Sequence, residues 1–71
     1  MVKIGGIYKH YKGNLYEVLA VAKHSESLDN MVVYKALYGE GEVWVRPANM
    51  FEEVVLVDGV SRLRFELCDG I

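Results

Sequence analysis

The residues whose types could support catalysis are three consecutive polar side chains, His24, Ser25 and Glu26. They have the composition of a hydrolytic triad, and His24 with Glu26 could also donate and accept a proton. Their adjacency argues against a triad, because neighbours in a strand point to opposite faces whereas a triad converges from separate segments. Two interpretations remain: a turn in which Ser25 and Glu26 bond backbone N–H groups, and the polar rim of a binding site.

A second candidate is the pair Trp44 and Arg46, with one residue between them. A guanidinium between aromatic side chains can hold a carboxylate or a phosphate through two parallel hydrogen bonds. Arg46 could instead form a structural ion pair with Glu17 or Glu26. Trp44 is equally open to two roles, as a platform on which a base or a proline-rich peptide stacks and as a filler of the core.

The spacing of the possible metal ligands does not indicate a metal site. The histidines and the cysteine are His10, His24 and Cys68, and they form no HxH, CxxC or HExxH pattern. Structural zinc sites normally have paired ligands at short spacing. We therefore expect no metal and no cofactor, and we expect His10 to be a hydrogen-bonded structural residue or a member of a binding rim.

An alternation of apolar and polar residues with a period of two, together with many β-branched and aromatic residues, predicts an all-β chain. The expected strands cover residues 6–11, 15–23, 31–38, 42–46, 54–57 and 62–67. Pro47 ends the fourth strand because it has no N–H to donate, and residues 47–53 can form one helical turn. A chain of 71 residues forms a single domain, residues 1–71. Strands this short predict a small SH3-like barrel of about five to six antiparallel strands.

The register of the third and fourth strands follows from the turn at residues 39–41. A three-residue loop there places Tyr34 opposite Arg46, and it keeps two like charges from facing each other. Alternation along residues 15–23 places His24 in phase with an apolar row at the end of the second strand. We therefore predict that His24 and Arg46 belong to one cluster at the rim of the barrel.

Together these segments resemble a known pattern. The chain reads GIYKHYKGNLYEV at residues 6–18, AKHSE at 22–26, VYKALY at 33–38 and WVRP at 44–47. This resembles the small bacterial family called domain of unknown function 1653 (DUF1653), whose pattern has a G-x-Y-x-H-x-K-G-x-x-Y start, an H-S-E step, a Y-x-x-L-Y strand and a W-x-R-P step. Ser27 stands where the family pattern has Thr, which keeps the hydroxyl. The resemblance covers almost the whole chain and implies a free-standing small domain with no agreed activity.

Composition narrows the choice of partners. The net charge is −2, and an overall acidic domain is a poor general binder of nucleic acid, although Lys3, Lys9 and Lys12 make the start of the chain basic. We expect no signal peptide, because Met1–Lys3 leads into Gly5 and Gly6 and not into an apolar run, and we expect no membrane association, because the apolar stretches are too short to span a bilayer. A single cysteine fits a reducing, cytoplasmic location. The hydrophobic fraction of 52% is also compatible with a homo-oligomer.

The sequence therefore predicts an uncharacterised binding module whose ligand is a small anion or a peptide. The candidate ligand-binding residues are Tyr8, His10, His24, Ser25, Glu26, Tyr34, Trp44 and Arg46. The alternative is a small enzyme or enzyme accessory in which His24 and Glu26 transfer a proton. Two polar groups within hydrogen-bond reach in a cleft would favour the enzyme, and a shallow aromatic groove would favour binding.

Overall fold

The computed structural model describes residues 2–68, and this range contains seven strands and one helical turn. The elements in chain order are β1 (Ile7–His10), β2 (Leu15–Lys23), β3 (Asn30–Ala36), β4 (Val43–Pro47), α1 (Ala48–Phe51), β5 (Val54–Val57), β6 (Val60–Leu63) and β7 (Phe65–Leu67). The prediction of an all-β chain is confirmed. The helical turn expected after the fourth strand is also present, as α1.

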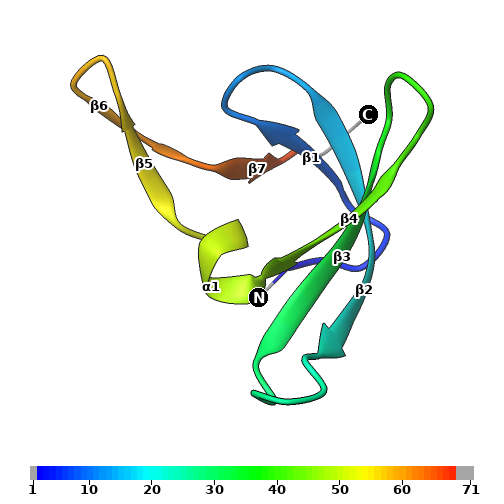
Figure 1. The fold of residues 1–71 in the computed structure, drawn as a ribbon. Helices are drawn as coiled ribbons and strands as arrows, with labels where there is room; N and C mark the ends of the chain where they lie inside the picture. The colour runs from blue at the N-terminus through cyan, green and yellow to red at the C-terminus, as the bar shows by residue number, and fades with distance from the viewer. Residues whose placement is uncertain (1, 69–71) are drawn as a thin grey trace.

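Five of the strands form one antiparallel sheet in the order β4-β3-β2-β1-β7, and β5 pairs with β6 in a separate hairpin. The sheet is strongly curved, α1 lies on its concave side, and the β5–β6 hairpin projects away from it (Figure 1). Within residues 2–68 no backbone pairing joins β4 to β7, so the ladder does not close into a barrel.

The strand predicted at residues 62–67 is divided in the structure. The Asp-Gly pair at residues 58–59 adopts φ values of 50° and 78°, as a two-residue hairpin turn requires. This tight turn starts β6 earlier than predicted, and Arg64 then separates β6 from β7. The Arg64 N–H donates to the Glu53 carbonyl, and its own carbonyl accepts the Tyr11 N–H. Arg64 therefore connects the base of the hairpin to the sheet.

The core lies between the concave face of the sheet and α1. Phe51 of α1 stacks on Phe65 of β7, with ring centroids 4.0 Å apart and ring planes 3° apart. The buried core residues are Tyr8, Val18, Val32, Tyr34, Phe51 and Phe65. A helix of one turn is not stable alone, so burial of its phenylalanine, at roughly 25 cal/mol per Å² of apolar surface, fixes α1 in place.

A bulge in β2 changes which residues face the core. Val18 pairs with Tyr34, but Ala20 pairs with Val33, so one extra residue lies between Val18 and Ala20. Paired residues share a face of the sheet, and Tyr34 is on the core face while Val33 is on the outer face. Ala20 and every second residue after it therefore point outward. The alternation predicted along the whole second strand is wrong beyond Val18.

The loop between β3 and β4 is longer than predicted. Tyr34 pairs with Trp44 and Val32 pairs with Arg46, so the predicted pairing of Tyr34 with Arg46 is wrong. The Ala36 N–H donates to the Glu42 carbonyl, which leaves a five-residue connection whose two glycines have φ of 58° and 68°. The shift is an even number of residues, so Trp44 and Arg46 keep the face on which Tyr34 lies.

Candidate functional site

Arg46 and three rings form a cationic and aromatic cluster on the concave side of the sheet. We call this cluster the arginine–aromatic site and define it as His10, Tyr34, Arg46 and Phe65. The Arg46 Nε–H donates to the Tyr34 hydroxyl over 3.4 Å, and the Arg46 Cζ lies 5.9 Å from the centre of the Phe65 ring. A weak hydrogen bond and a cation–π contact thus orient the guanidinium, and its terminal nitrogens have no partner within residues 2–68.

His10 reaches this site from β1, where it pairs with Phe65 of β7 and packs against that ring at 4.9 Å. Its Nδ1 accepts the Lys12 N–H over 3.2 Å, so neutral His10 carries its ring proton on Nε2. Partial burial, followed by the charges of Arg64, Arg46 and Lys12, lowers the pKa of His10 from its ordinary value of 6.5. The imidazole is therefore neutral near pH 7, beside a concentration of positive charge.

The two arginines beside His10 differ in their partners. Arg64 is paired with Glu53: its Nε–H donates to Oε1 over 3.0 Å, and its Nη2 contacts the same oxygen. Arg46 forms no ion pair with an acidic side chain of the described chain. The interpretation of Arg46 as half of a structural ion pair is therefore wrong for residues 2–68.

Two further tyrosines extend the ring cluster. The hydroxyls of Tyr16 and Tyr38 are 2.7 Å apart and share a hydrogen bond, and the Tyr16 ring meets Tyr34 edge-on at 5.4 Å. Burial, together with the hydrogen bond that Tyr16 shares with Tyr38, raises the pKa of Tyr16 to about 12. The phenol is neutral at physiological pH, so it acts as a hydrogen-bonding group and not as a base.

A recess of about 220 Å³ lies beside Trp44 at the β3–β4 turn, and we call it the Trp44 recess. Its lining residues are Ala36, Tyr38, Gly39, Glu40, Glu42 and Trp44. Trp44 is 49% exposed, so it does not fill the core. Trp44 and Arg46 point to the same side of β4 with one residue between them, which places their Cα atoms about 7 Å apart.

Tyr8 belongs to the core and not to a rim. Its side chain is 7% exposed, and its ring meets Phe51 edge-on at 5.3 Å. Its hydroxyl accepts the Lys3 N–H over 2.9 Å, which satisfies the polar end of the side chain. Tyr34 is buried to a similar degree, at 5% exposure, but its hydroxyl reaches Arg46. Of these two predicted site residues, only Tyr34 belongs to the arginine–aromatic site.

The segment His24, Ser25 and Glu26 forms the exposed turn between β2 and β3. The His24 Nδ1 accepts the N–H of Glu26 over 3.2 Å and that of Ser27 over 3.3 Å. The backbone of His24 also donates to the Asp29 carbonyl over 2.9 Å. The imidazole therefore caps its own turn, a role that the turn interpretation had given to Ser25 and Glu26.

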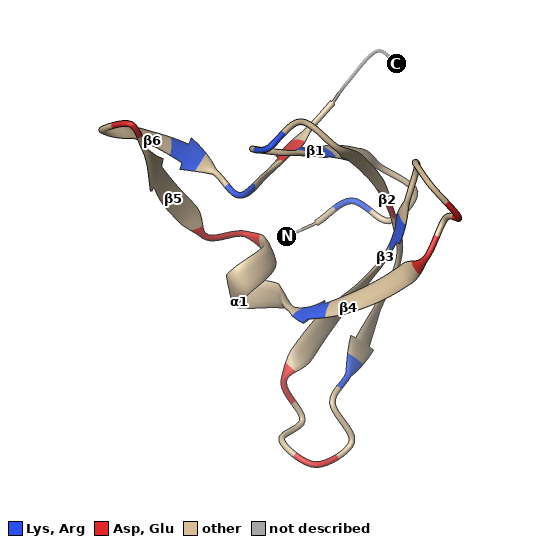
Figure 2. Ribbon diagram, turned by 45° about the horizontal axis from the view of Figure 1, so that its top comes forward, with Lys and Arg blue, Asp and Glu red and all other residues tan. Residues whose placement is uncertain are grey.

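The structure places His24 and Arg46 apart. Because of the bulge in β2, His24 points to the outer face, whereas Arg46 pairs with Val32 on the core face. Figure 2 shows the basic residue of β4 beside α1. The turn between β2 and β3 lies away from α1, at the far end of the β2–β3 hairpin. The predicted cluster of His24 with Arg46 is wrong, and His10 is the histidine beside the arginine.

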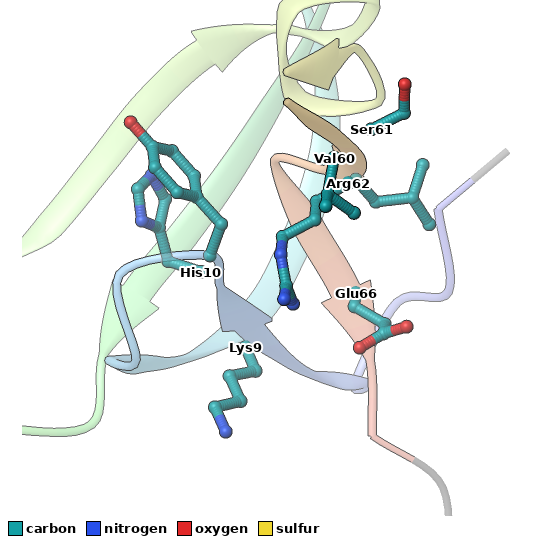
Figure 3. Close-up of a pocket in the computed structure, with 8 residues that line it drawn as sticks. Lys9, His10, Val60, Ser61, Arg62 and Glu66 are labelled. Atoms are coloured by element: carbon teal, nitrogen blue, oxygen red, sulfur yellow. The ribbon is translucent and has the colours of Figure 1, made fainter. Parts of the chain in front are cut away.

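A larger recess, of about 500 Å³, opens between β1 and β6 (Figure 3). Its lining residues are Lys9, His10, Tyr11, Val60, Ser61, Arg62, Leu63 and Glu66. Arg62 extends into the recess between His10 and Glu66, whereas Lys9 points away from it (Figure 3). The charged residues of this lining are Lys9, Arg62 and Glu66, so the Arg62 guanidinium shares the recess with a carboxylate, which Arg46 does not.

The described chain offers no evident metal centre. Residues 2–68 contain no group of three or more His, Cys, Asp or Glu side chains that could hold a metal ion. The thiol of Cys68 is free and lies 3.7 Å from the Glu66 carbonyl oxygen. In the same range, no helix has the length and apolar character needed to cross a membrane.

The chain matches a known protein family and a solved structure. The family model described as "Protein of unknown function (DUF1653)" matches residues 6–67. The chain belongs to the DUF1653 family. It is also similar to a crystal structure of a DUF1653 protein from Bordetella bronchiseptica, with 31% sequence identity and a TM-score of 0.80 over 87% of this chain and 82% of that chain. No curated protein matches the chain.

The two most specific DUF1653 motifs occupy different parts of this structure. The W-x-R-P step is the edge strand β4, with Trp44 and Arg46 on its concave face. The H-S-E step is the β2–β3 turn, where His24 bonds local backbone groups. The resemblance seen in the sequence is confirmed, while the expectation that both motifs build one rim is not met.

Phe65 of this DUF1653 chain was not among the predicted site residues. Its side chain is only 4% exposed and belongs to the core, but its ring also supports His10 and Arg46. The signal for this second role is the pairing of β1 with β7. Alternation within a strand cannot reveal it, because the two strands stand at opposite ends of the chain.

Proposed function

We propose that this chain is a binding module that takes a small anionic ligand, or a peptide through a carboxylate, at Arg46. The observation that carries this proposal is a half-buried guanidinium with aromatic support and no acidic partner in residues 2–68. Such a guanidinium offers parallel N–H groups to a carboxylate or a phosphate, and the rings around it exclude water and strengthen the pairing.

The charges near Arg46 favour an anion over a neutral ligand. Burial, followed by the charges of Arg64, Arg46 and Lys12, lowers the pKa of His10, and of the two arginines only Arg64 is paired with an acidic side chain in residues 2–68. An anion bound to Arg46 reduces this repulsion, so binding raises the pKa of His10 and is coupled to proton uptake below neutral pH.

The Trp44 recess suggests what else the ligand carries. It lies about one strand repeat from Arg46 and offers the exposed indole as an apolar wall. Glu40 and Glu42 line the same recess and disfavour a second anionic group there. The ligand class that fits is a molecule, or a peptide end, with one anionic group and one aromatic or apolar group.

We also infer that the curved sheet is an SH3-like barrel left open between β4 and β7. The continuous strand order from β4 through β1 to β7 supports this inference, as does the single helical turn before the last strands. Arg46 of β4 lies over Phe65 of β7, so side chains span the gap that the backbone leaves open. The free thiol of Cys68 is in keeping with a cytoplasmic location.

An NMR titration tests the proposed ligand class. The probes are N-acetylphenylalanine, which has a carboxylate and a ring, its neutral amide, and phenyl phosphate. We expect both anions to shift the resonances of Tyr34, Trp44 and the Arg46 side chain. We expect the amide to bind at least about tenfold more weakly, because it cannot accept two charge-assisted bonds.

Two variants with the same charge change provide the control. Arg46→Gln should abolish the response to the anions, and Arg62→Gln in the recess between β1 and β6 should leave it unchanged. Arg46→Lys keeps the charge but loses the two-pronged geometry, so its affinity should be intermediate. Equal binding of acid and amide, or shifts confined to the recess of Figure 3, would contradict the proposal.

A further inference from the structure

The outer side of β4 is a free sheet edge. The Ala36 N–H donates to the Glu42 carbonyl over 2.9 Å, and antiparallel ladders alternate residue by residue. Trp44 and Arg46 therefore bond to β3, while Val43, Val45 and Pro47 direct their backbone groups away from the sheet. In the described chain, β4 has no second neighbouring strand.

This edge has few of the features that normally prevent pairing between molecules: β4 is a five-residue strand with one charge, Arg46 on its concave face, and one proline. The β3–β4 ladder has no bulge, and β4 contains no lysine and no acidic residue. Val43 is 56% exposed and Val45 is 58% exposed, so both outward-directed valines are open to solvent. Pro47 blocks a single donor at the end of the strand, since only its own N–H is missing.

We propose that two copies of this chain pair antiparallel through their β4 strands, with Val45 on the two-fold axis. In this register Val45 meets Val45 of the partner subunit, and these two residues exchange both backbone hydrogen bonds. The Val43 N–H meets the carbonyl of the partner's Pro47, an interaction that needs no donor from the proline. This pairing therefore uses backbone groups of β4 that form no hydrogen bond with β3.

The side chains of β4 are complementary to themselves in the same register. Trp44 lies opposite the partner's Arg46, in a pair of the closer kind with Cα atoms about 4.5 Å apart. Trp44 is 49% exposed in one chain, and Arg46 has no acidic partner in residues 2–68. Two symmetric cation–π contacts therefore form across the interface.

This complementarity selects a second copy of the chain over an unrelated strand. A partner strand must present an aromatic ring to Arg46 and a cation to Trp44, in reversed order along the chain. The segment of residues 43–47 meets this condition itself. On the outer face, Val43 and Val45 of both subunits, together with the two prolines, form one apolar strip that pairing covers.

Pairing would also give each arginine–aromatic site a wall from the partner subunit. The Trp44 of one chain stands beside Arg46 of the partner subunit, so the indole can contact a ligand held by either arginine. The dimer itself rests on the backbone and the β4 side chains, and it does not depend on the proposed ligand.

Sedimentation equilibrium of the full chain tests the dimer. We expect the unmodified chain to dimerise reversibly, and we expect Val45→Lys to weaken dimerisation by at least about tenfold, because like charges then meet on the two-fold axis. The matched control is Leu56→Lys, which adds the same charge at a side chain 74% exposed on the β5–β6 hairpin and should leave the dimer intact.

Val45→Pro removes the outward N–H and leaves the β3–β4 bonds in place, so it should also give a folded monomer, as circular dichroism can verify. A chain that stays monomeric up to about 1 mM overturns the proposal. So does a dimer that Leu56→Lys disrupts and Val45→Lys does not, and so does a monomer that captures unrelated strand-forming peptides at β4. Loss of the dimer in Val45→Lys with anion shifts retained at Arg46 would separate this proposal from the ligand proposal.

Discussion

The five-stranded sheet and the β5–β6 hairpin have similar apolar strands but bury them very differently. On the concave face of the sheet, Val18 and Val32 have no exposed surface. On the hairpin, Val54 is 60% exposed and Leu56 is 74% exposed. Both regions have antiparallel pairing and β-branched residues, so strand formation alone does not determine burial.

The difference arises from what covers each strand. The sheet wraps around α1, whose Phe51 fills the concave face together with Phe65. The hairpin has no such cover within residues 2–68, and a two-stranded hairpin has too little surface to cover itself. Arg64 closes the base of the hairpin through a backbone bond and an ion pair to Glu53, and its carbonyl accepts the Tyr11 N–H of the sheet.

The largest expected effect comes from making the same deletion in both regions. Val32→Ala removes two buried methyl groups and should lower the free energy of unfolding by about 2 kcal/mol, because a cavity adds to the lost burial. Val54→Ala should change it by less than about 0.5 kcal/mol, because the side chain is already in water. Urea denaturation followed by circular dichroism measures both. Equal losses would mean that the hairpin is covered in solution.

A smaller effect is expected at the junction between the two regions. Arg64 and Glu53 are partly exposed, at 22% and 40%, so their ion pair should contribute about 1 kcal/mol or less. A double-mutant cycle with Arg64→Gln and Glu53→Gln measures this coupling. Arg64→Gln should also raise the pKa of His10, because Arg64 is the first of the charges that lower it. A coupling near zero would show that backbone bonds alone close the base of the hairpin.

The smallest effect is a pH dependence that distinguishes the two histidines. The pKa of His10 is lowered on folding, so the unfolded chain binds that proton more tightly. Neutral His10 makes its full contribution to the free energy of unfolding above its ordinary pKa of 6.5. This contribution is lost as the pH falls from 6.5 towards the lower pKa of the folded state. His10→Gln should remove this part of the pH dependence of unfolding. His24→Gln is the control and should leave this pH dependence unchanged. If His24→Gln removes the pH dependence and His10→Gln does not, the dependence belongs to the β2–β3 turn.

Much of the fold could be predicted from local pattern. The strand at residues 15–23 and the strand at residues 54–57 have the bounds that alternation and β-branched residues indicate. The helical turn after Pro47 follows from the loss of a backbone donor. Each of these features depends on residues that are close together in the sequence.

The candidate site was predicted only in part, because it depends on register. Alternation assumes one residue per pleat, and the bulge at Leu19 breaks this assumption without any glycine or proline to mark it. One extra residue was enough to move His24 to the outer face. Arg46 was identified correctly as a side chain among aromatic rings, since an even shift in the β3–β4 register preserved its face. Its neighbour His10 is brought there by pairing between distant strands.

The pairing of the first strand with the last has a consequence for synthesis. Tyr8 of β1 is opposite Leu67 of β7, so almost the whole described chain separates the two partners. Hairpins β1–β2, β2–β3 and β3–β4 can form as the chain leaves the ribosome, but β1 keeps an open edge until residues 65–67 have emerged. Phe51 likewise has no stacking partner before Phe65 arrives. The nascent chain therefore exposes an unfinished aromatic core until residues 65–67 have been synthesised, and its interval of greatest risk of misassembly lies before that point.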